Sequence, residues 1–438
     1  MPQTIPPSLL LLILTACSPL PAAAQVRTAI RAGWLVDVAR GEARRDQIVL
    51  IQDGRIEKVQ PGSVAPPAEV RVIDLSRYTV LPGLIDCHTH LVGDASSADV
   101  LLPLERSEAQ EVLSGVSNAR ATLLAGFTTV RDIGTYRAFV DVALRDAINN
   151  GIVIGPRMKV AGAYVTVSTG GGEVAGAAPD VPVPAIFRVG VANSADQVRE
   201  RVRVILNGGA DFIKLIATGA VFTRGTKPGV SEYTEEQIRA GVEQAAEYGT
   251  FVAAHAHGAE GIKRAVRAGV RSIEHGSLLD EEGIALMKRR GTWLVADIWN
   301  GDYTDSVGRR EKWPGDILRK NAETTETQRI GFRKAVAAGV KIAYGTDSGI
   351  YPHGLNAMQL PYMVRYGMTP MQAIRSATLS AAELMQWQDS VGSLAPGKYA
   401  DIIAIEGEAL ADLRSFMRVG FVMKGGTVYK GPGSGNRE

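Results

Sequence analysis

The stretch Asp86-Cys87-His88-Thr89-His90 directly follows an apolar run that is typical of a buried β-strand. Alternate side chains of an extended strand share one face, so His88 and His90 point the same way and can bind one metal ion together. Cys87 and Thr89 point to the other face, and Cys87 is expected to be a packed core thiol. Asp86 lies one layer deeper on the histidine face, where a carboxylate can orient a ligand. The stretch therefore predicts a metal-binding end on the first strand of a barrel.

Similar apolar runs recur later in the sequence and alternate with amphipathic segments. These runs lie at 127–131, 212–216, 251–255, 271–275 and 341–344. Repeated β-α units favour parallel strands joined by helical crossovers, and a section of roughly 300 residues can hold eight such units. We therefore expect an α/β fold in which residues 81–390 form a metal-binding (β/α)8 TIM barrel.

Both flanks of this section contain short alternating runs that are typical of exposed-face strands. Asp53-Gly54 separates two of the N-terminal runs and is a tight-hairpin signal. We expect residues 25–80 and 391–433 to pair with each other as one small β-sandwich domain, with residues 434–438 as a tail.

The N-terminal segment has the pattern of a secretory signal. Residues 8–14 are an apolar run too short to cross a bilayer as a helix, and small residues follow it. The alanines at 22–24 fit ordinary signal cleavage, whereas the stretch that ends at Cys17 resembles a lipobox, and both processing sites stay open. We expect residues 1–24 to be a signal peptide and the protein to be exported, either periplasmic or secreted, or an outer-membrane lipoprotein if it is lipidated at Cys17.

Composition excludes several other classes of protein. The 438 residues include 48 Lys and Arg against 46 Asp and Glu, a formal net charge of +2, which gives no basic footprint for nucleic acid. Membrane association is expected only through lipidation at Cys17. Of the two cysteines, processing leaves Cys87 without an intrachain partner, so a large apolar core rather than a disulfide framework must stabilise the fold.

Five of the six histidines fall at or just beyond the end of a predicted strand. Functional groups gather at the carboxyl ends of the strands in an α/β barrel. His255 and His275 each end a separate predicted strand, and two such histidines favour metal binding over structural packing. Asp347 follows the last predicted strand, where its residue type alone fits a turn or helix cap at least as well.

Lys214 lies inside the apolar run 212–216, where an unpaired ammonium group would be costly. A lysine of ordinary pKa also cannot bind a cation at neutral pH. Carboxylation by CO2 would convert the amine into a carbamate whose two oxygens can bridge two metal ions. The alternative is a lysine that pairs with a nearby aspartate.

Taken together and in order, these motifs resemble the amidohydrolase superfamily, close to its imidazolonepropionase-like and Xaa-Pro dipeptidase or carboxypeptidase branch. The sequence is also similar to ochratoxin-degrading amidohydrolases. The matching motifs lie at 81–90, 126–132, 210–214, 255–258, 273–276, 345–347 and 397–401. The resemblance extends over essentially the whole chain after the signal segment.

The resemblance implies two Zn2+ ions per chain. His88, His90 and Asp347 would hold one ion, His255 and His275 the other, and carboxylated Lys214 would bridge the two. Asp347 would take a proton from a metal-bridging hydroxide and return it to the leaving nitrogen. His257 is the candidate for a hydrogen bond to the substrate carbonyl, with a structural role as the alternative. For His353, beyond Asp347, a surface role and a substrate contact are equally open.

One segment departs from the family pattern. Residues 168–173 read Ser-Thr-Gly-Gly-Gly-Glu where relatives often carry a histidine beside a glycine pair. The glycine run lacks the Lys-Ser/Thr of a phosphate-binding P-loop. We therefore expect a mobile loop over the site.

The activity implied by these features is hydrolysis of the amide bond of dipeptides or N-acyl amino acids, as in carboxypeptidases and dipeptidases, with ochratoxin A as one candidate substrate. Arg224 and Lys227 could bind the substrate carboxylate or be solvated loop residues. The alternatives are a lactonase or esterase with the same metal centre, and a non-catalytic periplasmic binding protein. The family relationship also suggests a homo-oligomer, with an octamer as one option.

Overall fold

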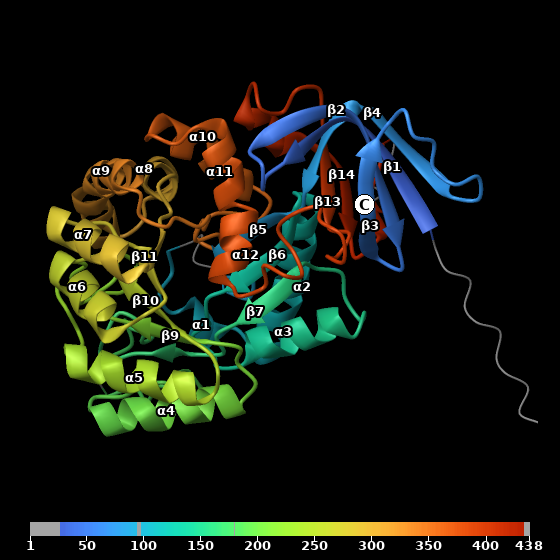
Figure 1. Ribbon diagram of the computed structural model, residues 1–438. Helices are drawn as coiled ribbons and strands as arrows, with labels where there is room; N and C mark the ends of the chain where they lie inside the picture. The colour runs from blue at the N-terminus through green and yellow to red at the C-terminus, as the bar shows by residue number, and fades with distance from the viewer. Residues whose placement is uncertain (1–26, 94–97, 179, 433–438) are drawn as a thin grey trace, which may run out of the picture.

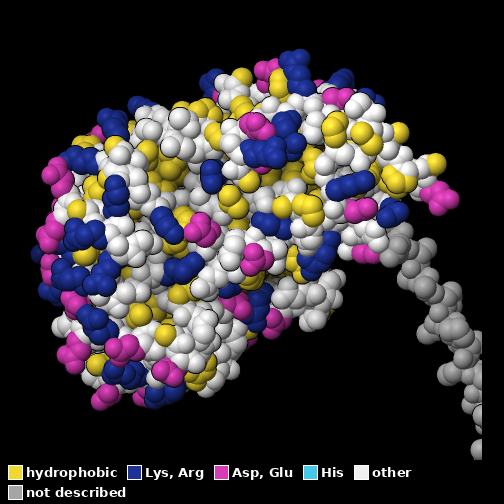
Figure 2. Space-filling view, viewed as in Figure 1, with side chains coloured by type: hydrophobic (Ala, Val, Ile, Leu, Met, Phe, Trp, Pro, Cys, Tyr) yellow, Lys and Arg dark blue, Asp and Glu magenta, His cyan; other side chains and the backbone are white. Residues whose placement is uncertain are grey.

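The computed structural model describes residues 27–93, 98–178 and 180–432 of the chain. The expected signal peptide at 1–24, both of its processing sites and the tail at 434–438 lie outside the described residues. Figure 1 shows a β-rich part next to a larger part in which strands and helices alternate. Figure 2 shows basic and acidic side chains interspersed over one face of the molecule.

Strands from both ends of the chain form one seven-stranded sheet (Figure 1). In their order across the sheet, the strands are β15 (Thr427–Lys430), β14 (Val419–Lys424), β13 (Ile402–Glu406), β4 (Arg71–Pro82), β1 (Arg27–Asp37), β2 (Glu42–Gln52) and β3 (Arg55–Pro61). β4 lies between β1, with which it is parallel, and β13, with which it is antiparallel. Residues far apart in the sequence therefore share one sheet.

This sheet bends back on itself and encloses an apolar core. Ile56 N donates to Lys398 O and Ala400 N donates to Gly54 O, both at 2.8 Å, so the β2–β3 hairpin meets the segment that leads into β13. Gly54 has a φ of +75°, and a Cβ there would lie 2.6 Å from Gly425 O, so only glycine fits this turn. The expected β-sandwich is thus a single hydrogen-bonded sheet that covers its own core.

The larger part consists of parallel strands with helices packed outside them. Its strands are β5 (Leu84–Thr89), β6 (Phe127–Asp132), β7 (Arg157–Val160), β8 (Tyr164–Val165), β9 (Ile213–Ile216), β10 (Val252–Ala256), β11 (Ser272–His275) and β12 (Trp293–Val295). Its helices are α1 (Leu102–Glu105), α2 (Glu108–Leu124), α3 (Val140–Asn149), α4 (Ala195–Asn207), α5 (Glu235–Glu247), α6 (Ala259–Ala268), α7 (Glu281–Arg290), α8 (Asn300–Glu311), α9 (Gly315–Ala338), α10 (Gln359–Arg365), α11 (Pro370–Ser376) and α12 (Leu379–Leu384). Short 3-10 helices lie at Ala185–Phe187, Asn356–Met358 and Leu413–Arg418.

Helix boundaries here follow from local sequence. α5 begins at a capping box in which Thr234 Oγ1 accepts from Gln237 N and the Gln237 side chain accepts from Thr234 N. α6 ends at Gly269, whose φ of +98° supplies the left-handed cap. Neighbouring helices from α4 to α7 contact one another along the outside of β9, β10 and β11, as Figure 1 shows. Every residue of these three strands is buried, because the helices cover one face of the strands and the interior of the fold lies on the other.

The parallel strands fall in two sheets, β12-β11-β10-β9-β8 and β5-β6-β7, and no closed barrel is found as one sheet among the described residues. One interruption lies at 161–163, where the φ of +71° at Gly162 separates β7, which pairs with β6, from β8, which pairs with β9. The other lies at 341–348, a segment that is irregular but still hydrogen-bonded on both sides. Leu294 N donates to Lys341 O and Cys87 N donates to Tyr344 O, so this segment links β12 to β5.

No helix within 27–93, 98–178 or 180–432 combines the length and the apolar character that a membrane crossing needs.

Candidate metal centre

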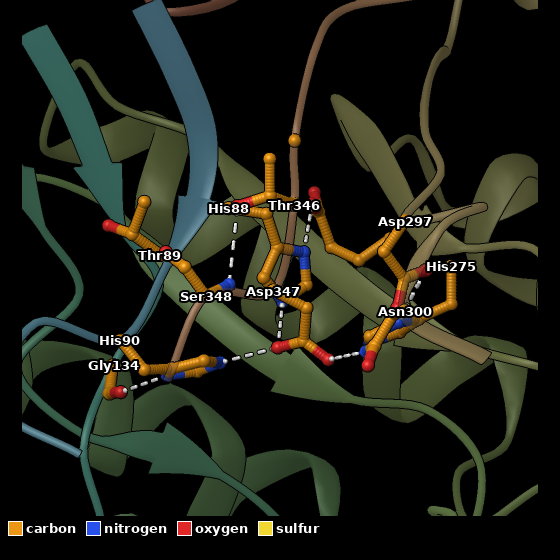
Figure 3. A network of polar contacts seen from close by, with 12 residues as sticks. His88, Thr89, His90, Gly134, His275, Asp297, Asn300, Thr346, Asp347 and Ser348 are labelled. Atoms are coloured by element: carbon orange, nitrogen blue, oxygen red, sulfur yellow. Dashed lines mark hydrogen bonds and ion pairs between the residues drawn. The ribbon is translucent and has the colours of Figure 1, made fainter. Parts of the chain in front are cut away.

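The histidines predicted as ligands meet at the carboxyl ends of the parallel strands. His88 lies in β5, His255 in β10 and His275 at the end of β11, while His90 and His257 lie just beyond β5 and β10. Figure 3 shows His88, His90 and His275 around the carboxylate of Asp347. Parallel strands bring their carboxyl ends to one edge, so residues almost 200 positions apart become neighbours.

One group of candidate ligands consists of His88, His90 and Asp347, whose ligand atoms lie within 4.8 Å of one another. Asp347 Oδ1 is 3.3 Å from His88 Nε2 and 3.2 Å from His90 Nε2. A single metal ion held by these three atoms would replace their direct contacts. The arrangement is the one that the sequence predicted for the first ion, and the ligand roles themselves stay a prediction.

A second group consists of His255, His257 and His275. The ring centroids of His255 and His275 are 4.6 Å apart, and those of His257 and His275 are 4.7 Å apart. His275 also belongs to a third group, with Asp297 and Asp347, which connects the two histidine groups. The structure therefore places His257 among the ligand candidates, whereas the sequence predicted a substrate contact with a structural role as the alternative.

Each of these imidazoles has a hydrogen-bond partner on one ring nitrogen. Glu274 Oε2 accepts from His88 Nδ1 at 3.0 Å, and Gly134 O accepts from His90 Nδ1 at 3.0 Å. His255 Nε2 is 3.3 Å from Gly219 O, and His257 Nδ1 is 2.7 Å from Ser277 Oγ. His275 Nδ1 is 3.2 Å from Asp297 Oδ1. Such partners fix the tautomer and the ring orientation, and they leave the other ring nitrogen available as a ligand atom.

Burial keeps several of these rings neutral, as a metal ligand must be. It lowers the pKa of His88, lowers that of His257 to about 3 and lowers that of His255 well below its usual value. A neutral imidazole has a free lone pair for a metal ion.

A buried ion pair supports His88 from behind. Arg131 and Glu274 are both fully buried, and Arg131 Nη2 donates to Glu274 Oε1 at 2.7 Å. Burial raises the pKa of Glu274, but the Arg131 guanidinium and the His88 hydrogen bond together hold it below its usual value. The sequence did not predict either residue, because each looks like an ordinary strand residue until its partner across the sheet is known.

Lys214 lies on β9 and lines the same cavity as the histidines, with only 2% of its surface exposed. Burial lowers its pKa to about 8, against the opposing effect of the carboxylates Glu274 and Asp347. An appreciable fraction of Lys214 is then a neutral amine near neutral pH, which is the form that reacts with CO2.

Asp347 is held in place from two directions. Its backbone has a φ of +59°, in the left-handed region that non-glycine residues adopt uncommonly. Asp86 holds Thr346, the residue before Asp347. Asp86 Oδ2 accepts from Thr346 Oγ1 at 2.6 Å and from Asn356 Nδ2 at 2.8 Å.

Asn300 holds the carboxylate of Asp347 from the other side. Asn300 Nδ2 donates to Asp347 Oδ2 at 3.1 Å and also to Asp297 Oδ2 at 3.1 Å. Asp297 lies two residues beyond the end of β12 at Val295, so its position after a strand could have revealed it.

Other sequence predictions have mixed outcomes. The core position of Cys87 is confirmed, since its buried thiol packs in an apolar cluster. His353 is half-buried between Thr122 Oγ1 and His90 O, each 3.2 Å from a ring nitrogen, so it packs behind a ligand candidate instead of lying at the surface. Arg224 and Lys227 are exposed, and neither lines the cavities described below.

The segment 168–173 contacts the site, as expected, but it is hydrogen-bonded to its surroundings. The Glu232 carboxylate accepts from Gly171 N at 2.9 Å, and Thr223 Oγ1 donates to Gly171 O at 2.6 Å. Gly171 and Gly172 line the metal-site cavity. These bonds attach the expected mobile loop to the connections that follow β9.

Two adjoining cavities reach this site. The cavity that contains the ligand candidates, the metal cavity, has a volume of about 780 Å³ including its mouth. Beside it lies a side pocket of about 1060 Å³, likewise counted with its mouth. The residues that line both are His90, Tyr136, Tyr164, Phe222, Thr223, Asp347 and Ile350. The two cavities are therefore direct neighbours that share these side chains.

Histidines and carboxylates around a cavity at the ends of parallel strands define a candidate metal-dependent hydrolase. The chain belongs to the amidohydrolase family, whose model matches residues 79–429. Enzymes of this family typically use a metal, and the His and Asp groups above are candidate ligands for it.

Similar proteins match most of the length of the chain. The ochratoxinase of Aspergillus niger is 33% identical over 436 residues, covering 93% of this chain and 88% of the relative. The imidazolonepropionase of Rhizorhabdus wittichii is 27% identical, covering 88% of this chain and 94% of that one. A Xaa-Pro dipeptidase solved with methionine bound in the active site is 36% identical, with a TM-score of 0.86 over 92% of this chain and 100% of that chain.

Family and similarity together establish that this protein is a hydrolase acting on amide bonds, as the sequence predicted. They also imply a TIM barrel with a β-rich domain. The two parallel sheets and the seven-stranded sheet of Figure 1 are consistent with that architecture.

Proposed function

We propose that this enzyme uses two Zn2+ ions to hydrolyse the amide bond of dipeptides or N-acyl amino acids, ochratoxin A among them. The observation that carries the proposal is the meeting of two histidine groups at Asp347, with Lys214 buried in the same cavity. Two ligand groups that are connected through a third, His275 with Asp297 and Asp347, fit a pair of neighbouring ions better than a single one.

The chemistry of the donor set fits zinc. Imidazole nitrogens and carboxylate oxygens are ligands that Zn2+ prefers. In this proposal His88, His90 and Asp347 would hold one ion, His255 and His275 would hold the other, and carboxylated Lys214 would be a ligand of both. When bound, such ions supply an activated water and polarise a carbonyl group.

Asp347 is suited to move the proton that this hydrolysis requires. Its Oδ1 faces His88 and His90, while Asn300 holds its Oδ2 at 3.1 Å. The carboxylate is therefore held in one orientation, in which it could accept a proton from the attacking water and deliver it to the leaving nitrogen. Asp347 is the catalytic residue of the proposal.

His257 is suited to contact the substrate carbonyl. Ser277 Oγ lies 2.7 Å from its Nδ1, and if the hydroxyl donates there, the proton of the neutral ring is on Nε2. Nε2 is then a hydrogen-bond donor for the carbonyl oxygen as negative charge develops on it. His255, His275 and carboxylated Lys214 would hold the second ion in this proposal, which would leave His257 free for the substrate.

Other features of the protein are proposed from sequence and family alone. We propose that the two parallel sheets act together as one (β/α)8 barrel, because residues 341–348 hydrogen-bond to both. The pattern of residues 1–24 favours export, with lipidation at Cys17 as the route to a membrane. A homo-oligomer is testable by sedimentation, and export by mass determination of the mature N-terminus.

The decisive experiment loads the enzyme with zinc, counts zinc per chain, and assays dipeptides, N-acyl amino acids, ochratoxin A and lactones. We expect two zinc ions and turnover of amides. Turnover of lactones alone would favour a lactonase, and zinc-free chains without turnover would favour a binding protein.

A second experiment tests Lys214 itself. After incubation with 13CO2, a carbamate signal should appear in the wild-type NMR spectrum and disappear in Lys214→Ala. Acetate or propionate should restore part of the lost activity by supplying the missing oxygens. Lys334→Ala, at an exposed lysine of α9, is the control. Full activity of Lys214→Ala without added acid would refute the bridging role.

A further inference from the structure

The side pocket opens on one flank of the metal cavity. It is lined by His90 and Asp347, which also line the metal cavity. His255, His257 and His275 line only the metal cavity. A molecule that spans both spaces therefore has one part beside Asp347 and another beside the second histidine group.

The wall of the side pocket is largely apolar. Its apolar side chains come from four connections of the fold and include Val92, Val100, Val174, Phe222 and Ile350. Tyr136 and Tyr164 form the boundary with the metal cavity. Counted together with its opening to solvent, the pocket has a volume of about 1060 Å³.

Charged side chains in this wall are engaged with the protein. Arg137 Nε donates to Glu111 Oε2 at 2.9 Å, and Arg137 Nη2 donates to the carbonyl of Arg106 at 2.6 Å. Glu173 forms an ion pair with Arg188. Because these charges are paired, the wall gains more from contact with apolar groups than with a carboxylate.

We propose that the side pocket binds the side chain of the amino acid on the leaving side of the scissile amide, and that it selects large apolar side chains. This inference rests on the proposed function. Asp347 delivers a proton to the leaving nitrogen, so that nitrogen and the residue attached to it lie on the Asp347 flank, where the side pocket opens. The acyl part lies on the flank of His255, His257 and His275.

Two substrate series test this assignment with the zinc-loaded enzyme. In the leaving series, an N-acetyl group is constant and the amino acid is Gly, Ala, Leu, Phe, Arg or Asp. In the acyl series, the leaving residue is Ala and the acyl residue is Gly, Leu or Phe. We expect kcat/KM to rise about 10- to 100-fold from Ala to Leu and Phe in the leaving series, which is the gain from burying one large apolar side chain.

A substitution that fills the pocket should reduce this preference. Val174 is buried in the wall, so Val174→Phe should lower the Phe-to-Ala ratio of kcat/KM about 10-fold by removing space for the side chain. Val181→Phe, at an exposed valine in the same connection, is the matched control and should leave the ratio unchanged. If Val174→Phe melts early, Ala175→Phe fills the same pocket from a less buried position.

The outcomes separate the two proposals. No turnover in either series by enzyme with two zinc ions would overturn the proposed function and this inference with it. Three results would leave the function standing but overturn the inference. They are equal kcat/KM values throughout the leaving series, a preference for Arg or Asp in that series, and a preference that appears only in the acyl series. An unchanged ratio in both pocket-filling variants would also overturn it.

Discussion

Glu274 Oε2 lies 3.0 Å from His88 Nδ1, and the same carboxylate accepts a hydrogen bond from Arg131 at 2.7 Å. All three side chains are buried. The carboxylate fixes the His88 ring with Nε2 toward Asp347, and it makes that nitrogen a stronger ligand. The buried ion pair of Arg131 and Glu274 thus influences the candidate metal site through the His88 imidazole.

Glu274→Gln should therefore weaken zinc binding about 10- to 100-fold, because the neutral amide orients and polarises His88 less well. Competition with a fluorescent chelator measures the affinity. Glu326→Gln, at an exposed glutamate of α9, makes the same chemical change away from the site. Equal affinities of the two variants would show that Glu274 only packs.

Asn300→Ala should lower kcat about 10- to 100-fold with little effect on zinc content. Asn300 Nδ2 donates to both Asp297 and Asp347, so its loss frees the carboxylate that moves the proton. Steady-state kinetics and metal analysis of the same preparation separate the two effects. Asn207→Ala, at an exposed asparagine, is the control. A loss of zinc in proportion to kcat would contradict this role.

Lys320→Met should destabilise the protein by about 1–3 kcal/mol, because it leaves buried carbonyls without a donor. Lys320 Nζ is buried on α9 and donates to Thr223 O at 2.7 Å and Val221 O at 3.3 Å, in the connection that carries Phe222 into both cavities. Urea unfolding gives the stability. Lys334→Met, on the exposed side of α9, should change it little. Equal losses of unfolding free energy in the two variants would show that any lysine substitution in α9 destabilises the protein, and that the Lys320 hydrogen bonds are not the cause.

Glu232→Gln should remove a pH-dependent loss of stability. Burial raises the pKa of Glu232 to about 7, from 4.5, although the Gly171 hydrogen bond acts to lower it. A raised folded-state pKa gives stability that is present below pH 4.5 and is lost as pH rises to 7. Melting temperatures of wild type and variant should diverge over this window, with the variant higher above it. Glu236→Gln, exposed on α5, should follow wild type.

Much of the site could be predicted because its residues occupy regular positions in strands. His88 and His90 alternate along β5, and His255 and His275 end apolar runs, so strand geometry alone places them at one edge. The structure brings these four side chains together with Asp347. Their roles as zinc ligands and the carboxylation of Lys214 remain predictions.

The supporting residues could not be predicted in the same way. Arg131 and Glu274 are 143 positions apart, and nothing local to either residue indicates a buried partner. The breaks between the two parallel sheets were also hidden, since the backbone at Gly162 and Asp347 takes positive φ through contacts made only in the folded chain. The local sequence pattern indicates the strands, whereas the interruptions in hydrogen bonding between the two sheets depend on tertiary structure.

The antiparallel pairing of β4 with β13 also constrains how the chain folds as it is made. Thr79 of β4 bonds to Gly407, 328 residues later, so one edge of β4 has no partner until nearly the whole polypeptide has been synthesised. An open strand edge of this kind is a template for aggregation, and contacts between distant residues form slowly. Chains that stop before Ile402 should therefore accumulate as aggregates, even though every candidate metal ligand is present in them.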